Sequence, residues 1–178
     1  MKTVINLFHP NYQYSQVNRA MVDAVKDEIE VRNLAELYPD FNIDIEKEQQ
    51  VMANADRIVL QFPLQWYSTP ALLKHWEDQV FTYGWAYGSQ GNTLQDKQLL
   101  IAVTVGADNY GRDGFVKYTV DELLRPLQAT SRLIGMKYMK PFVVMGASSI
   151  SNAELKNVGP SYRKYLNDET IPVLGDFE

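Results

Sequence analysis

The sequence predicts an α/β fold: a doubly wound, five-stranded parallel sheet with helices on both faces. Two observations predict it. Five short apolar segments alternate with five segments of helical periodicity, and such alternation gives parallel strands joined by right-handed crossovers. Residues 99–105 form the most apolar segment and fit a strand buried on both faces, which we expect at the centre of the sheet. All 178 residues are expected to form one domain, because no linker or repeat interrupts the series.

Each predicted strand is a short run rich in Ile, Val and Leu. Pro10, Pro63 and Gly146 end three of these runs, since proline cannot continue a ladder and glycine favours a turn. The predicted strands are residues 3–8, 29–34, 57–62, 99–105 and 142–145.

Apolar residues spaced three and four apart predict the helices. Ser15 stands where it can cap the first helix. We expect Pro126 to bend the fourth helix and Gly159-Pro160 to interrupt the fifth, because proline removes a backbone hydrogen bond. The predicted helices are residues 15–25, 44–55, 69–82, 118–133 and 153–166.

Composition excludes several kinds of chemistry. The chain has no cysteine, which excludes disulfides, thiolate nucleophiles and iron–sulfur clusters, and its two histidines are too few for a site of histidines alone. No metal is therefore expected. A net charge of −5 argues against nucleic-acid binding. Without a membrane-length apolar run or a signal peptide, the chain is expected to be cytoplasmic.

Function is expected at the carboxyl ends of the strands, in the loops of residues 9–15, 63–69 and 106–117. The first loop and the helix start carry His9, Ser15, Gln16 and Asn18, which can bond a phosphate beside helix amides. It contains no Walker motif and no Gly-x-Gly-x-x-Gly. A plain His-Pro turn followed by a Ser cap is an equal alternative.

Aromatic residues concentrate in the second region. Residues 62–87 hold eight of them, where the 12% composition predicts about three. Trp76 and Phe81 have the spacing of core residues, whereas four others lie in loops, where large rings often pack on a flat ligand or a partner subunit. These four are Trp66, Tyr67, Trp85 and Tyr87. An isoalloxazine ring against residues 62–67 fits this pattern.

The third loop begins with small residues, Thr104-Val105-Gly106-Ala107, that let a ring approach the backbone closely. Its polar residues, which include Tyr110 and Arg112, have no diagnostic spacing. Arg112 and Lys117 are either partners for a 2′-phosphate or solvated loop charges.

Taken together, these segments resemble the flavodoxin-like NAD(P)H:quinone oxidoreductases, a family that includes DT-diaphorase. Within it the chain is most similar to bacterial general-stress NAD(P)H oxidoreductases and to ancillary proteins of glutathione-gated Kef potassium efflux systems. The resemblance spans almost the whole chain. It rests on His9-Pro10, Ser15, Asn18, residues 37–44, residues 61–67, Pro70-Ala71-Leu72-Leu73-Lys74 with Trp76, residues 82–88 and Gln128-Ala129-Thr130.

The resemblance implies a flavoprotein and a homodimer, and it favours FMN over FAD as the cofactor. It implies that the flavin phosphate is held by His9, Ser15, Gln16, Val17 and Asn18. It implies that the isoalloxazine lies against Pro63, Leu64, Gln65, Trp66, Tyr67, Thr104, Val105, Gly106 and Ala107. Trp85 and Tyr87 of one subunit are expected to bind substrate in the pocket of the other.

The implied activity is ping-pong transfer of two electrons. Hydride passes from NAD(P)H to the flavin N5, the oxidised nicotinamide leaves, and a quinone or similar planar acceptor takes its place. Diaphorases carry a Tyr and a His for proton handling after the fourth strand. Tyr110 is the candidate catalytic residue here, although it is offset from that pattern and no histidine follows His75, so water is the alternative proton source.

Three other functions remain open. The resemblance also implies a regulatory ancillary subunit, peripherally associated with a potassium efflux channel, and this role is compatible with the enzyme. A flavodoxin-type electron carrier shares the architecture but normally has several Ser or Thr and a Gly around the phosphate. A binding module without flavin is the remaining alternative.

Overall fold

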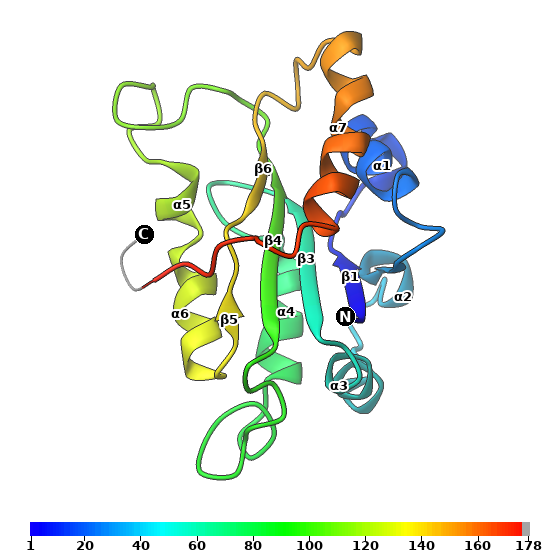
Figure 1. Ribbon diagram of the computed structural model, residues 1–178, viewed down its shortest axis with the longest axis vertical. Helices are drawn as coiled ribbons and strands as arrows, with labels where there is room; N and C mark the ends of the chain where they lie inside the picture. Colours follow the sequence, from blue (N-terminus) through cyan, green and yellow to red (C-terminus); the bar gives the residue numbers. More distant parts are fainter. Residues whose placement is uncertain (176–178) are drawn as a thin grey trace.

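A parallel sheet runs through the computed structural model, which describes residues 1–175 (Figure 1). The strand order is β2-β1-β3-β4-β5. Strand β6 pairs with the same edge of β4 as β5 does, but nearer the carboxyl end of β4. This order places the topological switch between β1 and β3, where ligands bind in such sheets. The predicted doubly wound parallel sheet is confirmed. The strands are β1 (Thr3–Leu7), β2 (Glu30–Asn33), β3 (Arg57–Pro63), β4 (Gln98–Thr104), β5 (Lys137–Tyr138) and β6 (Phe142–Val144).

Helices cover both faces and divide the core into two clusters. On one face α1 (Gln16–Asp23) and α7 (Asn152–Leu166) pack together over the sheet. The other face carries α3 (Ile45–Ala53), α4 (Ala71–Val80), α5 (Val120–Leu123) and α6 (Arg125–Leu133). Two one-turn elements, η1 (Tyr12–Tyr14) and α2 (Leu34–Leu37), are too short to show periodicity in the sequence. Within residues 1–175 no helix has the length and apolar character needed to cross a membrane.

One predicted strand position needs correction, and one short strand was not predicted. The central strand is β3, whereas β4, expected there, lies next to it and is equally well buried along its length. The predicted strand of residues 142–145 is confirmed as β6, and the short strand β5, which also pairs with β4, was not predicted.

Both proline predictions also differ from the structure. Residues 118–133 form two helices that meet at Leu124, and Pro126 stands in the first turn of α6, where its missing N–H costs nothing. The predicted interruption of α7 is wrong, since the helix continues through Gly159 and Pro160. A Cβ at Gly159 would lie 2.7 Å from the Ala20 carbonyl oxygen, so glycine lets α7 approach α1 closely. That packing holds the helix together despite the lost hydrogen bond.

A buried carboxylate ties four elements together on the face that α3 and α4 cover. Glu48 on α3 accepts hydrogen bonds from Arg32, from the Tyr38 hydroxyl at 2.5 Å and from the Trp76 indole at 3.0 Å. Burial would raise the pKa of Glu48, but the hydrogen bonds from Arg32 and Tyr38 bring it below its usual value. The network fixes α4 immediately after the second predicted loop.

A second buried carboxyl on the same face has a raised pKa, in contrast to the lowered pKa of Glu48. Glu77 on α4 is only 9% exposed, and burial raises its pKa to about 7. The folded protein therefore binds this proton more tightly than the unfolded chain, whose carboxyl titrates near 4.3. The resulting stability is present in acid and is lost as the pH rises through about 7.

We expect the free energy of unfolding to fall by about 2–3 kcal/mol from pH 5 to pH 8 because of the Glu77 carboxyl. Glu77→Gln should remove this pH dependence, because the amide does not titrate. Urea unfolding at both pH values measures it, with exposed Glu46→Gln as the control. An unchanged pH dependence in Glu77→Gln would contradict the assignment.

Candidate functional site

A cavity of about 540 Å³ opens at the carboxyl ends of β1, β3 and β4. Its volume is in the range of small-molecule sites. All three predicted regions reach it, together with a segment after β6. The lining residues are His9, Pro10, Asn11, Tyr14, Ser15, Gln16, Val17, Pro63, Leu64, Gln65, Thr104, Gly106, Ala147, Ser148 and Ile150.

The start of α1 gives one wall of the cavity a set of hydrogen-bond donors. The Ser15 hydroxyl caps the helix by accepting from the Asn18 N–H at 3.2 Å. The N–H groups of Gln16 and Val17, in the first turn, have no acceptor within the helix. Such a helix start favours an anionic group.

His9 adds a donor of fixed tautomer to this wall. Its Nδ1 accepts the Asn11 N–H at 3.1 Å, so the neutral ring carries its proton on Nε2. Burial lowers the pKa of His9, which keeps the ring neutral at physiological pH. Together with the α1 amides, this arrangement fits a phosphate.

Asn18 lies beneath the cavity rather than in its wall and is 1% exposed. Its amide donates to the Thr104 hydroxyl at 3.1 Å and to the Ser15 hydroxyl at 3.2 Å. Its side-chain oxygen accepts from Gln61 at 3.1 Å, and Gln61 accepts from the Tyr162 hydroxyl at 3.1 Å. We call this chain from Tyr162 through Gln61 and Asn18 to Thr104 and Ser15 the amide relay.

The second loop makes a tight turn with unfavourable backbone geometry. Trp66 and Tyr67 have φ values of 46° and 62°, while Gln65 and Ser68 exchange backbone hydrogen bonds of 2.9 and 3.0 Å. Two-residue hairpins of this form normally use Asn or Gly at these positions. Left-handed geometry costs about 1–2 kcal/mol for each such residue. Strain of this kind concentrates at functional sites.

The side chains of Trp66 and Tyr67 lie outside the cavity wall. Trp66 is 93% exposed, and neither Trp66 nor Tyr67 lines the cavity wall. Tyr67 packs edge-on against Tyr110, with ring centroids 6.3 Å apart. Burial, with a smaller effect of Tyr67, raises the pKa of Tyr110, so its hydroxyl keeps the proton at neutral pH. Tyr110 therefore lies behind the turn and outside the cavity.

The third predicted region meets a segment that the sequence reasoning missed. Backbone hydrogen bonds of 2.9–3.1 Å join residues 146–148 to residues 105–107. A Cβ at Gly106 would lie 2.8 Å from the Ser148 hydroxyl, so a larger residue at position 106 would require that side chain to move. Val105 and Ala107 are engaged in the pairing and do not line the cavity.

Ala147, Ser148 and Ile150 line the cavity without having been predicted. A signal for them exists, because they follow the fifth strand at the same sheet edge and small residues dominate Gly146-Ala147-Ser148-Ser149. The rule that selected the other loops applies to this one equally.

Trp85 and Tyr87 lie at the other end of the sheet. Their loop connects the end of α4 to the start of β4, and therefore lies at the amino ends of the strands, at the bottom of Figure 1. Both residues pack partly against the core of their own chain. Within one chain they do not reach the cavity.

Comparison with known proteins agrees with this architecture. A family model described as having a flavodoxin-like fold matches residues 1–166. General stress protein 14 of Bacillus subtilis (strain 168) is 45% identical over 96% of this chain and all of its own length. An uncharacterised NAD(P)H oxidoreductase, YrkL, of the same organism is 44% identical, covering 95% of this chain and 99% of that protein. The potassium-efflux ancillary protein KefF of Enterobacter sp. (strain 638) is 44% identical, covering 90% and 92%.

Solved structures give the same picture. General stress protein 14 of Treponema denticola in complex with FMN superposes with a TM-score of 0.85 at 40% identity, covering 93% of this chain and 96% of that one. An NADPH-quinone reductase of P. pentosaceus superposes with a TM-score of 0.82 at 28% identity, and the match covers 98% of this chain and 100% of that one. A structure described as a thermophilic tryptophan halogenase from Streptomycin violaceusniger superposes with a TM-score of 0.90 at 46% identity. The match covers 93% of this chain and 98% of that one. The chain belongs to the flavodoxin-like family that contains the NAD(P)H oxidoreductases and quinone reductases.

Proposed function

We propose that this chain is an FMN-dependent NAD(P)H oxidoreductase that reduces quinones or similar planar acceptors. The observation that carries the proposal is the meeting of the loops after β1, β3 and β4 at one cavity, with anion-binding donors at its α1 wall. The FMN bound to the Treponema denticola relative supports the choice of flavin. The quinone reductase among the similar structures supports the class of acceptor.

The chain's own groups fit the two ends of FMN. The N–H groups of Gln16 and Val17 and the His9 Nε2–H would hold the phosphate. Pro63, Leu64 and Ile150 supply apolar wall for the ring. A bound flavin supplies the hydride acceptor and passes two electrons on to the second substrate.

The strained turn supplies donors that the fold does not use. The N–H groups of Leu64, Gln65 and Ser68 bond to carbonyls of the chain, whereas within residues 1–175 those of Trp66 and Tyr67 make no hydrogen bond. Fixed backbone donors stabilise negative charge that develops during reaction. We propose that Trp66 and Tyr67 act on the ring through their backbone.

Proton transfer has two candidates. Tyr110 keeps its proton at neutral pH and packs against the ring of Tyr67. It does not line the cavity, however, so a proton from Tyr110 would have to cross by way of water. Water alone is the alternative.

A second chain is part of the proposal. Trp85 and Tyr87 lie at the opposite end of the sheet from the cavity, so they can wall it only from a partner subunit. Tyr83 of the same loop is 71% exposed and stacks edge-on with Tyr87, leaving aromatic surface open to a partner. We propose a homodimer with each of these loops over the other chain's site.

A regulatory role is the second candidate. It is favoured by the 44% identity with the KefF ancillary protein over 90% of the chain. Peripheral association with a potassium efflux protein is compatible with the enzyme activity. Co-purification with such a membrane protein would support it.

We expect the purified protein to retain FMN after incubation with excess flavin and desalting, and to retain less FAD. NAD(P)H should then reduce the bound FMN in a single turnover, and repeated rapid turnover should require a quinone. Absorbance spectra and stopped-flow assays measure both. Tryptophan with chloride serves as a control substrate because of the halogenase-described relative. Colourless protein with either flavin would contradict the proposal.

Asn18→Ala should destabilise the flavin-free protein by about 1–3 kcal/mol, because it leaves buried groups of Gln61 and Thr104 without a partner. His9→Ala, which removes the Nε2–H proposed to hold the phosphate, should weaken FMN binding without this loss. Urea unfolding and FMN fluorescence titration separate the two effects. Wild-type stability in Asn18→Ala would show that the amide relay does not stabilise the fold.

Tyr87→Ala should leave FMN bound and raise KM for the quinone about two- to tenfold, through loss of a stacking contact. Sedimentation should show a dimer for both wild type and variant. A monomer at micromolar concentration, or loss of flavin with unchanged quinone kinetics, would place Tyr87 in its own chain's core only.

A further inference from the structure

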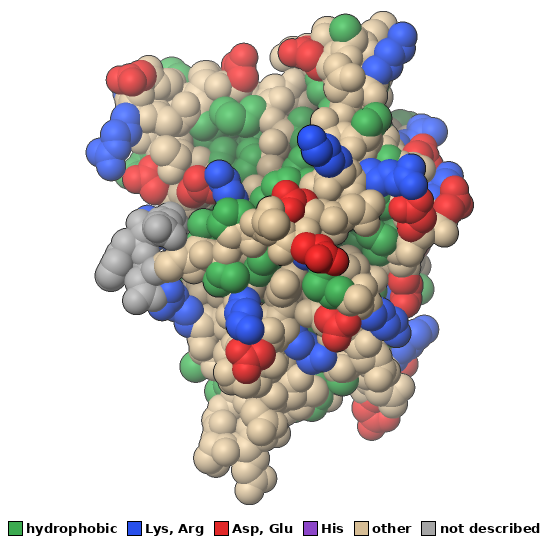
Figure 2. Space-filling model, viewed as in Figure 1, with side chains coloured by type: hydrophobic (Ala, Val, Ile, Leu, Met, Phe, Trp, Pro, Cys, Tyr) green, Lys and Arg blue, Asp and Glu red, His purple; other side chains and the backbone are tan. Residues whose placement is uncertain are grey.

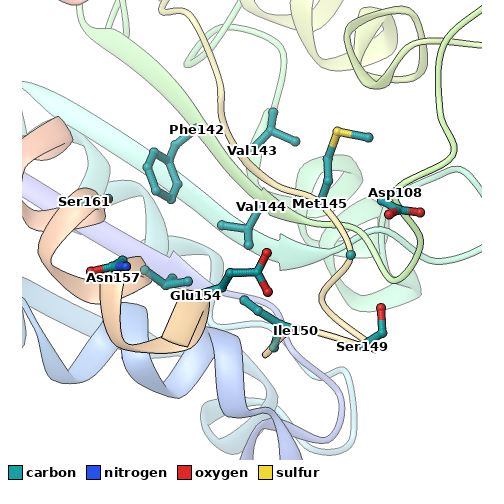
Figure 3. A pocket seen from close by; sticks show the side chains of 12 residues that line it. Asp108, Phe142, Val143, Val144, Met145, Ser149, Ile150, Glu154, Asn157 and Ser161 are labelled. Atoms are coloured by element: carbon teal, nitrogen blue, oxygen red, sulfur yellow. The ribbon is translucent and has the colours of Figure 1, made fainter. Parts of the chain in front are cut away.

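A second cavity, of about 580 Å³, lies between β6 and the first half of α7 (Figure 3). It shares Ile150 with the candidate flavin cavity, and only the segment of residues 146–149 stands between the two. In Figure 2 hydrophobic side chains show in the hollow between α7 and the loop of residues 106–118. The two cavities therefore adjoin each other near the carboxyl end of the sheet.

The floor of this second cavity is apolar and open. Phe142 and Val144 of β6 face α7 and belong to the same apolar cluster as Val158, whereas Val143 points to the other face of the sheet. The neighbouring part of the same sheet edge is covered, since residues 172 and 174 bond to residues 140 and 138 at 2.8 Å. The β6 part carries no such cover within residues 1–175. An open apolar floor with a polar rim is typical of a ligand site.

The rim of the cavity is acidic. Asp108 and Glu154 contribute carboxylates, the other polar lining residues are neutral, and no Lys or Arg among residues 1–175 lines it. Hydrogen bonds from Ser151 lower the pKa of Glu154, so it is charged at neutral pH. Arg112, on the same loop as Asp108, points to Glu122 at 3.8 Å. The rim therefore favours hydroxyl donors and opposes phosphate.

We infer that this cavity receives the adenosine end of the reduced dinucleotide, and that its rim selects NADH over NADPH. The inference rests on the proposed function. Adenine would lie on the apolar β6 floor, and the ribose hydroxyls would donate to Glu154 or Asp108. A carboxylate at this position accepts the 2′-hydroxyl of NADH and repels the 2′-phosphate of NADPH. Continuity through Ile150 lets one dinucleotide reach from the flavin cavity into this one.

Direct binding to the FMN-loaded protein tests the site without turnover. AMP, which keeps the 2′-hydroxyl, should bind and compete with NADH. Adenosine 2′,5′-bisphosphate should bind about tenfold more weakly or worse. Calorimetry measures both. Absence of AMP binding, or tighter binding of the bisphosphate, would overturn the inference.

Two conservative variants test the rim. Glu154→Gln keeps the capping box with Ser151, which accepts Glu or Gln, and Asp108→Asn removes the other charge. The wild-type kcat/KM ratio of NADH to NADPH should exceed about ten, and each variant should lower it several-fold while tightening bisphosphate binding. Glu46→Gln, a first-turn carboxylate of α3, is the matched control and should change neither.

An unchanged ratio in both variants, with NADH and NADPH still oxidised, would overturn the inference alone and leave the proposed function standing. A protein that binds FMN but oxidises neither dinucleotide would overturn the proposed function. AMP binding still reports on the cavity in that case.

Discussion

The amide relay is the constraint on which the candidate site depends. Tyr162 on α7, Gln61 on β3 and Asn18 on α1 form an unbroken series of side-chain hydrogen bonds that ends at Thr104 of β4. The series lies in the core, where each unmade hydrogen bond would cost the full desolvation of its group. It thereby fixes the start of α1 relative to the ends of β3 and β4. The α1 wall of the cavity and the wall formed by the loops after β3 and β4 are held in one register by the same groups.

Two contacts outside the relay explain how the chain supports a strained turn. Trp66 and Tyr67 adopt left-handed geometry immediately after β3, whose end is tied to β4 by the Leu64–Thr104 backbone hydrogen bond of 2.8 Å. On the far side of the turn, Glu48 holds Trp76 and with it α4. Rigid elements on both sides leave the turn little freedom to relax. The strain is retained, and within residues 1–175 the Trp66 and Tyr67 N–H groups have no acceptor.

Much of this could be predicted from the sequence, because apolar runs and breakers report local structure directly. The parallel order and the loops after β1, β3 and β4 followed from that pattern. The role of Asn18 did not, since a polar residue on a helix near a loop gives no sign of whether it faces a ligand or the core. The continuity of α7 depends on its packing against α1 at Gly159, a contact between distant segments. Trp85 and Tyr87 illustrate the same limit. Their own sequence does not show on which end of the sheet they lie, because this depends on how the connected elements are arranged.

Amide NMR during an FMN titration tests the central claim most directly, namely that the loops fixed by the relay hold the flavin. We expect the largest shifts at the amides of Gln16 and Val17, of Trp66 and Tyr67, and of Gly106 and Ser148. Small shifts are expected at Trp85 and Tyr87 in any monomeric fraction and larger ones in the dimer. Shifts confined to other parts of the chain, with these amides unchanged, would contradict the account.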